Sequence, residues 1–124
     1  MPVEDLKKSM EFFKGLGFAF NPQFTGEDSA CMIIAENMNA MLSSRSKFES
    51  FIKKPIAERS STEFLISLGC DSADRVREIS EKAFASGALK VNEPEDIGFM
   101  FSWGFEDLDG HIWDLFWMDP AHLQ

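Results

Sequence analysis

Tyrosine is absent from this 124-residue sequence, and histidine and cysteine occur only twice each. The two cysteines, Cys31 and Cys70, are far apart and do not form a CxxC or another metal-ligand spacing. The opening residues MPVEDLKKSM contain no apolar segment of the kind found in secretory signals. Isolated thiols without an export signal are typical of reduced residues, so we expect a cytoplasmic protein.

Long basic runs and long apolar runs are also missing. The longest basic stretches are the pairs Lys7–Lys8 and Lys53–Lys54, and the formal net charge is −9. Nucleic acids and anionic membranes bind surfaces rich in Lys and Arg. No apolar run approaches the roughly 20 residues of a membrane-spanning helix. The sequence therefore predicts a protein with neither nucleic-acid nor membrane partners.

What the sequence does contain is a normal globular composition with much non-polar aromatic surface. Hydrophobic residues make up 44% and charged residues 27%, with 13 Phe, 3 Trp and 7 Met. Apolar spacing in the first half predicts a helix in EDLKKSMEFFKGLG and three strands in FAFNPQFTG, ACMIIAEN and NAMLSS. A short helix, SRSKFESFIKKP, and a polar linker follow. The second half predicts a strand (TEFLISLGC), a helix (DSADRVREISEKAFASGA) and three strands (ALKV, FMFSWGFED and HIWDLFWM), with NEPEDIG as a polar loop.

The two halves repeat one order of elements, which indicates a duplicated unit. We assign residues 1–44 to a first module, 45–61 to a connector and 62–124 to a second module, all within one α+β domain of residues 1–124. The second module is a complete strand–helix–three-strand unit. In the first module most of the leading strand is truncated, because residue 1 falls where that strand would be ending.

One carboxylate lies in the middle of the apolar last strand. Because side chains alternate along a strand, Asp114 should share a face with Ile112 and Phe116, while Trp113 and Leu115 point to the other face. A carboxylate on an apolar face is costly to desolvate unless a metal, a hydrogen-bond donor or a cavity compensates it. Asp114 is therefore the leading candidate for a functional residue.

Four segments resemble the vicinal-oxygen-chelate superfamily, which includes glyoxalase I, the bleomycin-resistance proteins and the extradiol dioxygenases. They cover most of the chain and are PVEDLKKSMEFFKGLGF, NPQFTGEDSACMI, GCDSADRVREISEKAFASG and GFMFSWGFEDLDGHIWDLFWMDP. The most specific piece is FEDLDGHIW followed by an acid. Within the superfamily, the sequence is most similar to small bacterial proteins described as predicted lactoylglutathione lyases.

The resemblance implies paired βαβββ modules whose curled mixed sheets form a cup. It also implies a homodimer and a small-molecule ligand. In the metal-dependent members, the cup holds one divalent ion with carboxylate and imidazole ligands. Such an ion acts as a Lewis acid on the oxygens of a bound substrate. The expected cofactor is therefore a divalent metal or none.

Only one of the four family ligand positions retains a metal-binding residue. The fourth position, four residues after the glycine of the DLDG turn, is Asp114. The third, six residues before Asp71, is Leu65, the second is Met41 within about one residue, and the first would precede Met1. A catalytic zinc-type site needs about three protein ligands. The ligand set is therefore incomplete, and Asp114 is the single metal candidate.

We expect a ligand pocket lined by Met41, Leu65, Trp103 and Asp114, and we assign no catalytic residue. Further polar candidates near this pocket are Glu63, Asn39 and Ser67. Two alternatives remain open. The strand aromatics, Trp103 among them, are explained first by core and interface packing rather than by a ligand. Asp114 is also explained by a metal-free pocket or by backbone hydrogen-bond donors.

Two functions follow from the resemblance. The first is a lyase-like enzyme, similar to lactoylglutathione lyase, acting on a small oxygenated or thiol-conjugated substrate. The second is a metal-free module that binds a small molecule, as in sequestration by the bleomycin-resistance proteins. The acidic composition favours a cationic or neutral ligand over an anionic one. A plainer alternative is a cup that only supports assembly.

Overall fold

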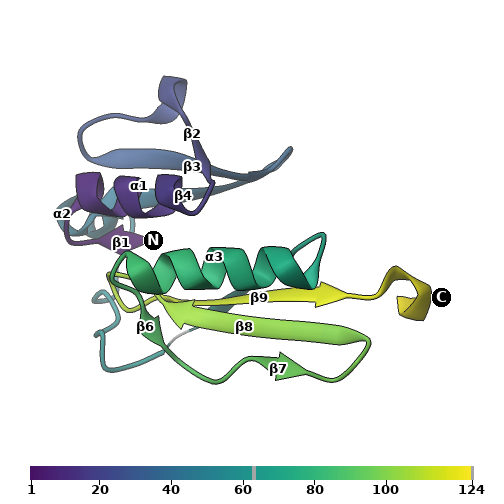
Figure 1. Ribbon diagram of the computed structural model, residues 1–124. Helices are drawn as coiled ribbons and strands as arrows, with labels where there is room; N and C mark the ends of the chain where they lie inside the picture. The colour runs from purple at the N-terminus through teal and green to yellow at the C-terminus, as the bar shows by residue number, and fades with distance from the viewer. Residues whose placement is uncertain (63, 124) are drawn as a thin grey trace. The chain divides into compact units, whose positions relative to one another are not determined.

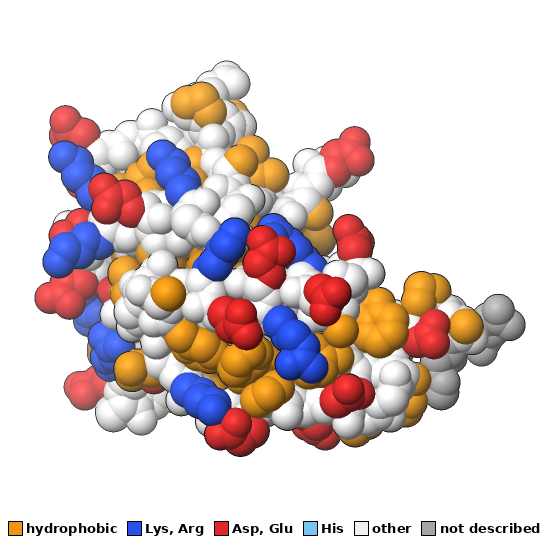
Figure 2. Space-filling view, viewed as in Figure 1, with side chains coloured by type: hydrophobic (Ala, Val, Ile, Leu, Met, Phe, Trp, Pro, Cys, Tyr) orange, Lys and Arg blue, Asp and Glu red, His pale blue; other side chains and the backbone are white. Residues whose placement is uncertain are grey.

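The computed structural model describes residues 1–62 and 64–123, and the chain forms two compact units, Met1–Glu58 and Arg59–Gln124 (Figure 1). Both cysteines are free. No helix in the described part of the chain is long and apolar enough to cross a membrane. On the face drawn in Figure 2, acidic and basic side chains are interspersed.

The first unit is built on a four-stranded mixed sheet with strand order β1-β4-β3-β2. Strand β1 is parallel to β4, whereas β3 is antiparallel to both β4 and β2. The elements are β1 (Pro2–Val3), α1 (Leu6–Gly15), β2 (Ala19–Asn21), the 3-10 helix η1 (Pro22–Phe24), β3 (Ser29–Ala35), β4 (Met38–Ser44) and α2 (Arg45–Glu49).

Helix α1 begins and packs as its sequence predicts. The Asp5 side chain accepts a hydrogen bond from Lys8 N at 3.1 Å, which satisfies one of the free backbone donors of the first turn. Phe12 and Phe13 are buried, and α1 lies along the sheet (Figure 1). The buried apolar residues of this unit are Val3, Phe12, Phe13, Leu16, Ala30, Cys31, Met32 and Leu42.

The second unit contains a five-stranded mixed sheet. Its strand order is β5-β9-β8-β6, with β7 also paired to β8, and β5 is parallel to β9. The elements are β5 (Leu65–Gly69), α3 (Ala73–Ala85), β6 (Leu89–Lys90), β7 (Glu95–Asp96), β8 (Met100–Glu106), β9 (Ile112–Met118) and the 3-10 helix η2 (Pro120–Leu123).

Helix α3 covers one face of this second sheet, along β8 and β9 (Figure 1). It begins at the cap Ser72, whose hydroxyl accepts a hydrogen bond from Arg75 N at 3.0 Å. Trp113 and Leu115 of β9 are each only 1% exposed, whereas Asp114 between them is half-buried. The predicted alternation along this strand is therefore confirmed, as are the α+β class and the mixed sheets.

The predicted element boundaries needed three corrections. The strand expected in FAFNPQFTG ends at Asn21, because Pro22 has no backbone donor for a ladder and starts η1 instead. The predicted short connector helix spans only Arg45–Glu49 and ends before Pro55. The segment expected to be a polar loop contains strand β7, Glu95–Asp96.

The duplication extends to the register of the strands. Pro2 lies three residues before the cap of α1 and pairs with Ser43, while Gly69 lies three residues before the cap of α3 and pairs with Phe116. Residues two positions earlier on β4 and β9 are Met41 and Asp114. These two residues therefore hold equivalent positions in the two sheets.

Candidate functional site

Asp114 lies in a row of small residues that crosses the second sheet. On one side it pairs with Ser67 of β5, and on the other with Gly104 of β8. Directly paired residues share one face of a sheet. Ser67 is small and exposed, and Gly104 has no side chain, so the flanks of the Asp114 carboxylate are open on both neighbouring strands.

The environment of Asp114 raises the pKa of its carboxyl. Partial burial is the main cause, and the negative charge of Glu95 adds to it. A hydrogen bond from Ser67 Oγ to Asp114 Oδ2, 3.4 Å long, acts in the opposite direction because it stabilises the charged form. Ser67 is the hydrogen-bond partner that the described residues offer to this carboxylate.

The rest of this surface, which we call the Asp114 face, is both apolar and acidic. The register places Leu65, Ile112 and Phe116 on it. The Phe116 ring lies over Gly69, at 3.5 Å from the point where a Cβ on that glycine would be. Glu95 pairs with Ser102, and Glu106 pairs with Ile112, so both acids belong to the same face.

Trp103 does not lie with Asp114. It pairs with Leu115, and its ring centroid is 5.2 Å from that of Phe84 on α3. Its indole Nε1 donates a hydrogen bond to Asn92 O at 3.2 Å. The structure therefore places Trp103 on the helix-covered face. The sequence alternation already places Leu115 on the face opposite Asp114. Because Trp103 pairs with Leu115, the β8–β9 register puts Trp103 on that opposite face too.

The structure brings Leu65 to the Asp114 face and places Met41 in the other unit. Leu65 is 55% exposed and pairs with Ile112, two residues before Asp114. Met41 is 42% exposed and pairs with Cys31 in the first sheet. Of the other polar candidates, Ser67 contacts Asp114 and Asn39 pairs with Ile33 in the first sheet, whereas Glu63 lies outside the described residues.

The residues at the positions where the resemblance implies metal ligands do not fit a divalent ion. Hard divalent cations prefer carboxylate, imidazole and carbonyl donors. Leu65 offers an alkyl chain, and Met41 offers a thioether. Within residues 1–62 and 64–123, no three His, Cys, Asp or Glu side chains are placed to hold a metal ion.

Asp107, the most buried acid of the hairpin between β8 and β9, was not among the residues predicted from the sequence. Asp107 is 2% exposed and accepts hydrogen bonds from Asp109 N (2.9 Å), His111 N (3.0 Å) and Trp113 Nε1 (2.9 Å). Burial raises the pKa of its carboxyl, and these donors and the charge of His111 oppose that shift. The signal was present in the sequence, since Asp before x-Asp-Gly is typical of a side chain that caps its own turn.

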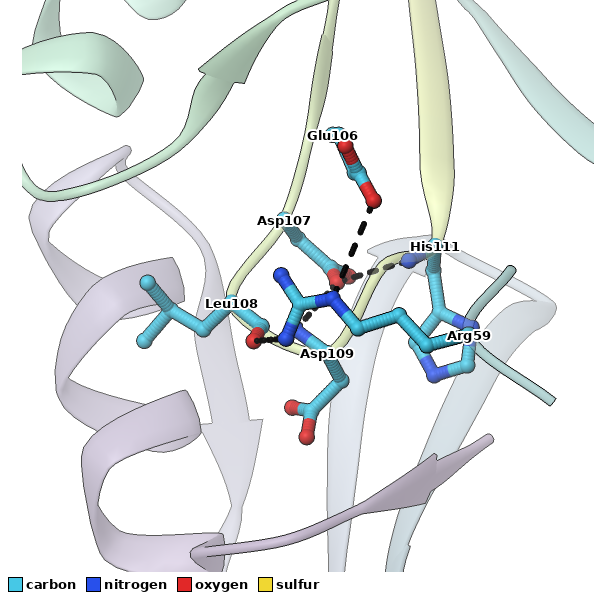
Figure 3. A network of polar contacts seen from close by, with 6 residues as sticks. All are labelled: Arg59, Glu106, Asp107, Leu108, Asp109 and His111. Atoms are coloured by element: carbon cyan, nitrogen blue, oxygen red, sulfur yellow. Dashed lines mark hydrogen bonds and ion pairs between the residues drawn. The ribbon is translucent and has the colours of Figure 1, made fainter.

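Arg59 binds the outside of the same turn (Figure 3). Its Nη1 donates to Leu108 O at 2.9 Å, and its Nε lies 3.9 Å from Glu106 Oε1. The guanidinium is about half exposed, so this ion pair adds little stability. The contact attaches Arg59, the first residue of the second unit, to the hairpin that carries Asp114.

Known proteins share this architecture. Residues 1–35 match the family model described as bleomycin resistance protein-like N-terminal. A glyoxalase/bleomycin resistance protein/dioxygenase family enzyme from Burkholderia phytofirmans superposes with a TM-score of 0.77 at 14% identity, covering 95% of this chain and 94% of that one. The chain has the vicinal-oxygen-chelate fold. The predicted resemblance to this superfamily is thus confirmed, while the closer similarity to lactoylglutathione lyases stays a prediction.

Two further structures with similar folds are informative. A hypothetical protein, SA1046 from S. aureus, has a TM-score of 0.80 and 28% identity, covering 94% of this chain and 88% of its own. A mutant of the fosfomycin resistance protein FosX from Listeria monocytogenes, complexed with Mn(II) and a dihydroxypropylphosphonic acid, has a TM-score of 0.66 and 21% identity, covering 93% and 82%. Among curated proteins, none matches the sequence significantly. A similar fold thus occurs in a protein solved with Mn(II) and a small phosphonic acid.

Proposed function

We propose that this protein is a metal-independent small-molecule-binding module of the vicinal-oxygen-chelate fold, and that its ligand contacts the Asp114 face. One observation carries the proposal. The carboxylate of Asp114 is half-buried on an apolar strand, and the two other positions at which the resemblance implies metal ligands carry Leu65 and Met41. Ligand sites are mostly apolar with a few placed polar groups. Asp114 has the character of such a polar group.

The chemistry of the face favours a ligand that combines an apolar body with a nitrogen cation or an N–H donor. Asp114, Glu95 and Glu106 give this face a negative charge, and the paired Arg59 offsets only part of it. Leu65, Ile112 and Phe116 provide apolar contacts beside the carboxylate. A charge-assisted hydrogen bond to Asp114 would replace water that the half-buried acid otherwise retains.

Binding of small ammonium compounds in the presence of EDTA tests this proposal. Benzylamine and tryptamine are the test ligands, and the anions benzoate and indole acetate are controls with the same rings. Shifts of amide signals in 1H–15N NMR spectra show where each compound binds. We expect the two amines to shift the amide signals of residues 67, 104 and 114, and the anions to leave them unchanged. Asp114→Asn should abolish the shifts, whereas Asp28→Asn, which removes the same charge in the other unit, should keep them. Equal responses of the two variants would contradict the proposal.

We also propose that the chain is a cytoplasmic homodimer. Several large apolar side chains are more than a third exposed, and such surfaces commonly mark subunit contacts. They include Phe24, Met38, Met41, Phe51, Phe64, Leu65 and Leu89. Light scattering after size-exclusion chromatography should give about twice the 14.0 kDa chain mass. A mass equal to one chain at all concentrations would contradict the dimer.

A second candidate function is a metal-dependent, lyase-like enzyme acting on a small oxygenated or thiol-conjugated substrate. The similarity of fold to a FosX structure solved with Mn(II) favours it. Titration with Mn²⁺ followed by NMR line broadening, together with a hemithioacetal turnover assay, separates the two candidates. Broadening confined to the Asp114 face with turnover that depends on Asp114 would favour the enzyme. Amine binding in EDTA without Mn²⁺-dependent turnover would favour the binding module.

A further inference from the structure

The turn that leads into strand β9 is held by one buried carboxylate. Asp107 Oδ1 accepts hydrogen bonds from Asp109 N and His111 N, and Figure 3 shows the Asp107 side chain pointing back across the turn. Backbone bonds from Asp107 N to His111 O (2.9 Å) and from Gly110 N to Asp107 O (3.1 Å) close the same turn. Gly110 has φ +87°, a conformation that favours glycine.

The second oxygen of Asp107 holds Trp113. Asp107 Oδ2 accepts the indole Nε1–H at 2.9 Å, and this hydrogen bond is buried. Trp113 is the residue directly before Asp114, and its side chain lies on the helix-covered face. Neighbouring side chains of a strand point to opposite faces of the sheet. A fixed Trp113 ring on one face therefore sets the direction of the Asp114 side chain on the other face.

Strand β8 restrains the same point from the side. A Cβ on Gly104 would collide with the backbone carbonyl of Trp113, so the two strands approach closely there. Gly104 is the residue paired with Asp114. Trp113 is therefore held through its side chain by Asp107, and its backbone carbonyl lies close against Gly104 of β8.

We propose that Asp107 is a positioning residue for the candidate site, acting through Trp113 to set the placement of the Asp114 carboxylate against Ser67. The importance of that placement for a ligand rests on the function proposed above, but the placement itself can be measured without a ligand. To close the turn, residue 107 needs only one oxygen that accepts hydrogen bonds from two backbone N–H groups. The side-chain oxygen of an asparagine would be enough for that. The second carboxylate oxygen is used for Trp113.

Two substitutions break the Asp107–Trp113 bond from its two ends. Trp113→Phe removes the donor and keeps an aromatic ring, and Asp107→Asn keeps an acceptor for the turn but faces the indole with an N–H group. Ser72→Ala is the matched control, because it removes the cap of α3 in the same unit without touching the hairpin. The first readout is the 13Cγ chemical shift of Asp114 at pH 7, assigned by its loss in Asp114→Asn. The second is the dissociation constant for benzylamine.

We expect the Asp114 signal to move in Trp113→Phe and in Asp107→Asn and to stay in place in Ser72→Ala. Benzylamine affinity should fall by about tenfold or more, the lower end of the loss seen when the hydrogen-bond partner that orients a metal ligand is removed. An unchanged Asp114 signal in a folded Trp113→Phe protein would overturn the proposal, as would an equal movement in Ser72→Ala. If Asp107→Asn does not fold, Trp113→Phe decides alone. If the wild type does not bind benzylamine, the function proposal fails while the 13C measurement still tests the positioning role.

Discussion

Met41 occupies, in the first sheet, the position that Asp114 occupies in the second. The equivalence follows from the register, because Pro2–Ser43 and Gly69–Phe116 are corresponding pairs of the two modules. The duplicated fold therefore carries an oxygen donor at this position in one module and a thioether in the other. A site that depends on one carboxylate can recognise an ammonium group but lacks the donors that a hard divalent ion prefers.

Restoring an imidazole should restore metal affinity. Leu65→His places a histidine on the Asp114 face, on the strand next to Asp114, at a leucine that is 55% exposed. We expect Zn²⁺ to bind this variant at least about tenfold more tightly than the wild type, equivalent to about 1.4 kcal/mol. Val91→His, at a similarly exposed position outside the strands, is the control. Isothermal titration measures the affinities for Zn²⁺. An equal gain of affinity in both variants would argue against position 65 as a place for a metal ligand beside Asp114.

Asp114 should cost stability at neutral pH. Burial raises the pKa of Asp114 in the folded protein. At a pH just above the ordinary aspartate pKa of about 3.9, the folded state therefore binds more protons than the unfolded state. The free energy of unfolding therefore falls as pH rises through the window between the two pKa values. Asp114→Asn lacks this titration, so its stability relative to the wild type should increase as the pH rises above the ordinary pKa of an aspartate. Urea unfolding at several pH values measures the difference, and a pH-independent difference would contradict the assignment.

The Ser67 hydroxyl should hold the pKa of Asp114 down. Its hydrogen bond to Oδ2 favours the charged carboxylate, so Ser67→Ala should raise the pKa of Asp114 further. Ser102→Ala removes a hydroxyl from the same face, where Ser102 pairs with Phe116, and serves as the control. A 13C titration of the Asp114 carboxyl distinguishes them. A lowered or unchanged pKa in Ser67→Ala would show that the hydrogen bond does not form in solution.

Gly104 should tolerate no side chain. A Cβ there collides with the Trp113 carbonyl, which is backbone and cannot move aside, so we expect Gly104→Ala to lose about 1–3 kcal/mol of unfolding free energy. Gly15, the last residue of α1, has no atom near the point of a Cβ. Gly15→Ala should therefore be neutral or stabilising by up to about 1 kcal/mol. Thermal unfolding of the two variants measures this contrast, and a neutral Gly104→Ala would contradict the close strand approach.

The periodic parts of the fold could be predicted from sequence because local pattern decides them. The two amphipathic helices and the alternation around Asp114 are local signals that the structure reproduces. Asp114 was found because a charge in an apolar strand is conspicuous. Asp107 was missed, because its role depends on Trp113, a partner that the hairpin brings back to it. Trp103 was misplaced beside Asp114 because the strands were read one at a time, without the β8–β9 register.

The most direct test of the account is the affinity of the wild type and of Asp114→Asn for benzylamine in EDTA, measured by isothermal titration at pH 7. We expect saturable binding by the wild type and at least about tenfold weaker binding by the variant, equivalent to about 1.4 kcal/mol or more. Binding that appears only after Mn²⁺ is added, or equal affinities for the two proteins in EDTA, would contradict a metal-independent site built on Asp114.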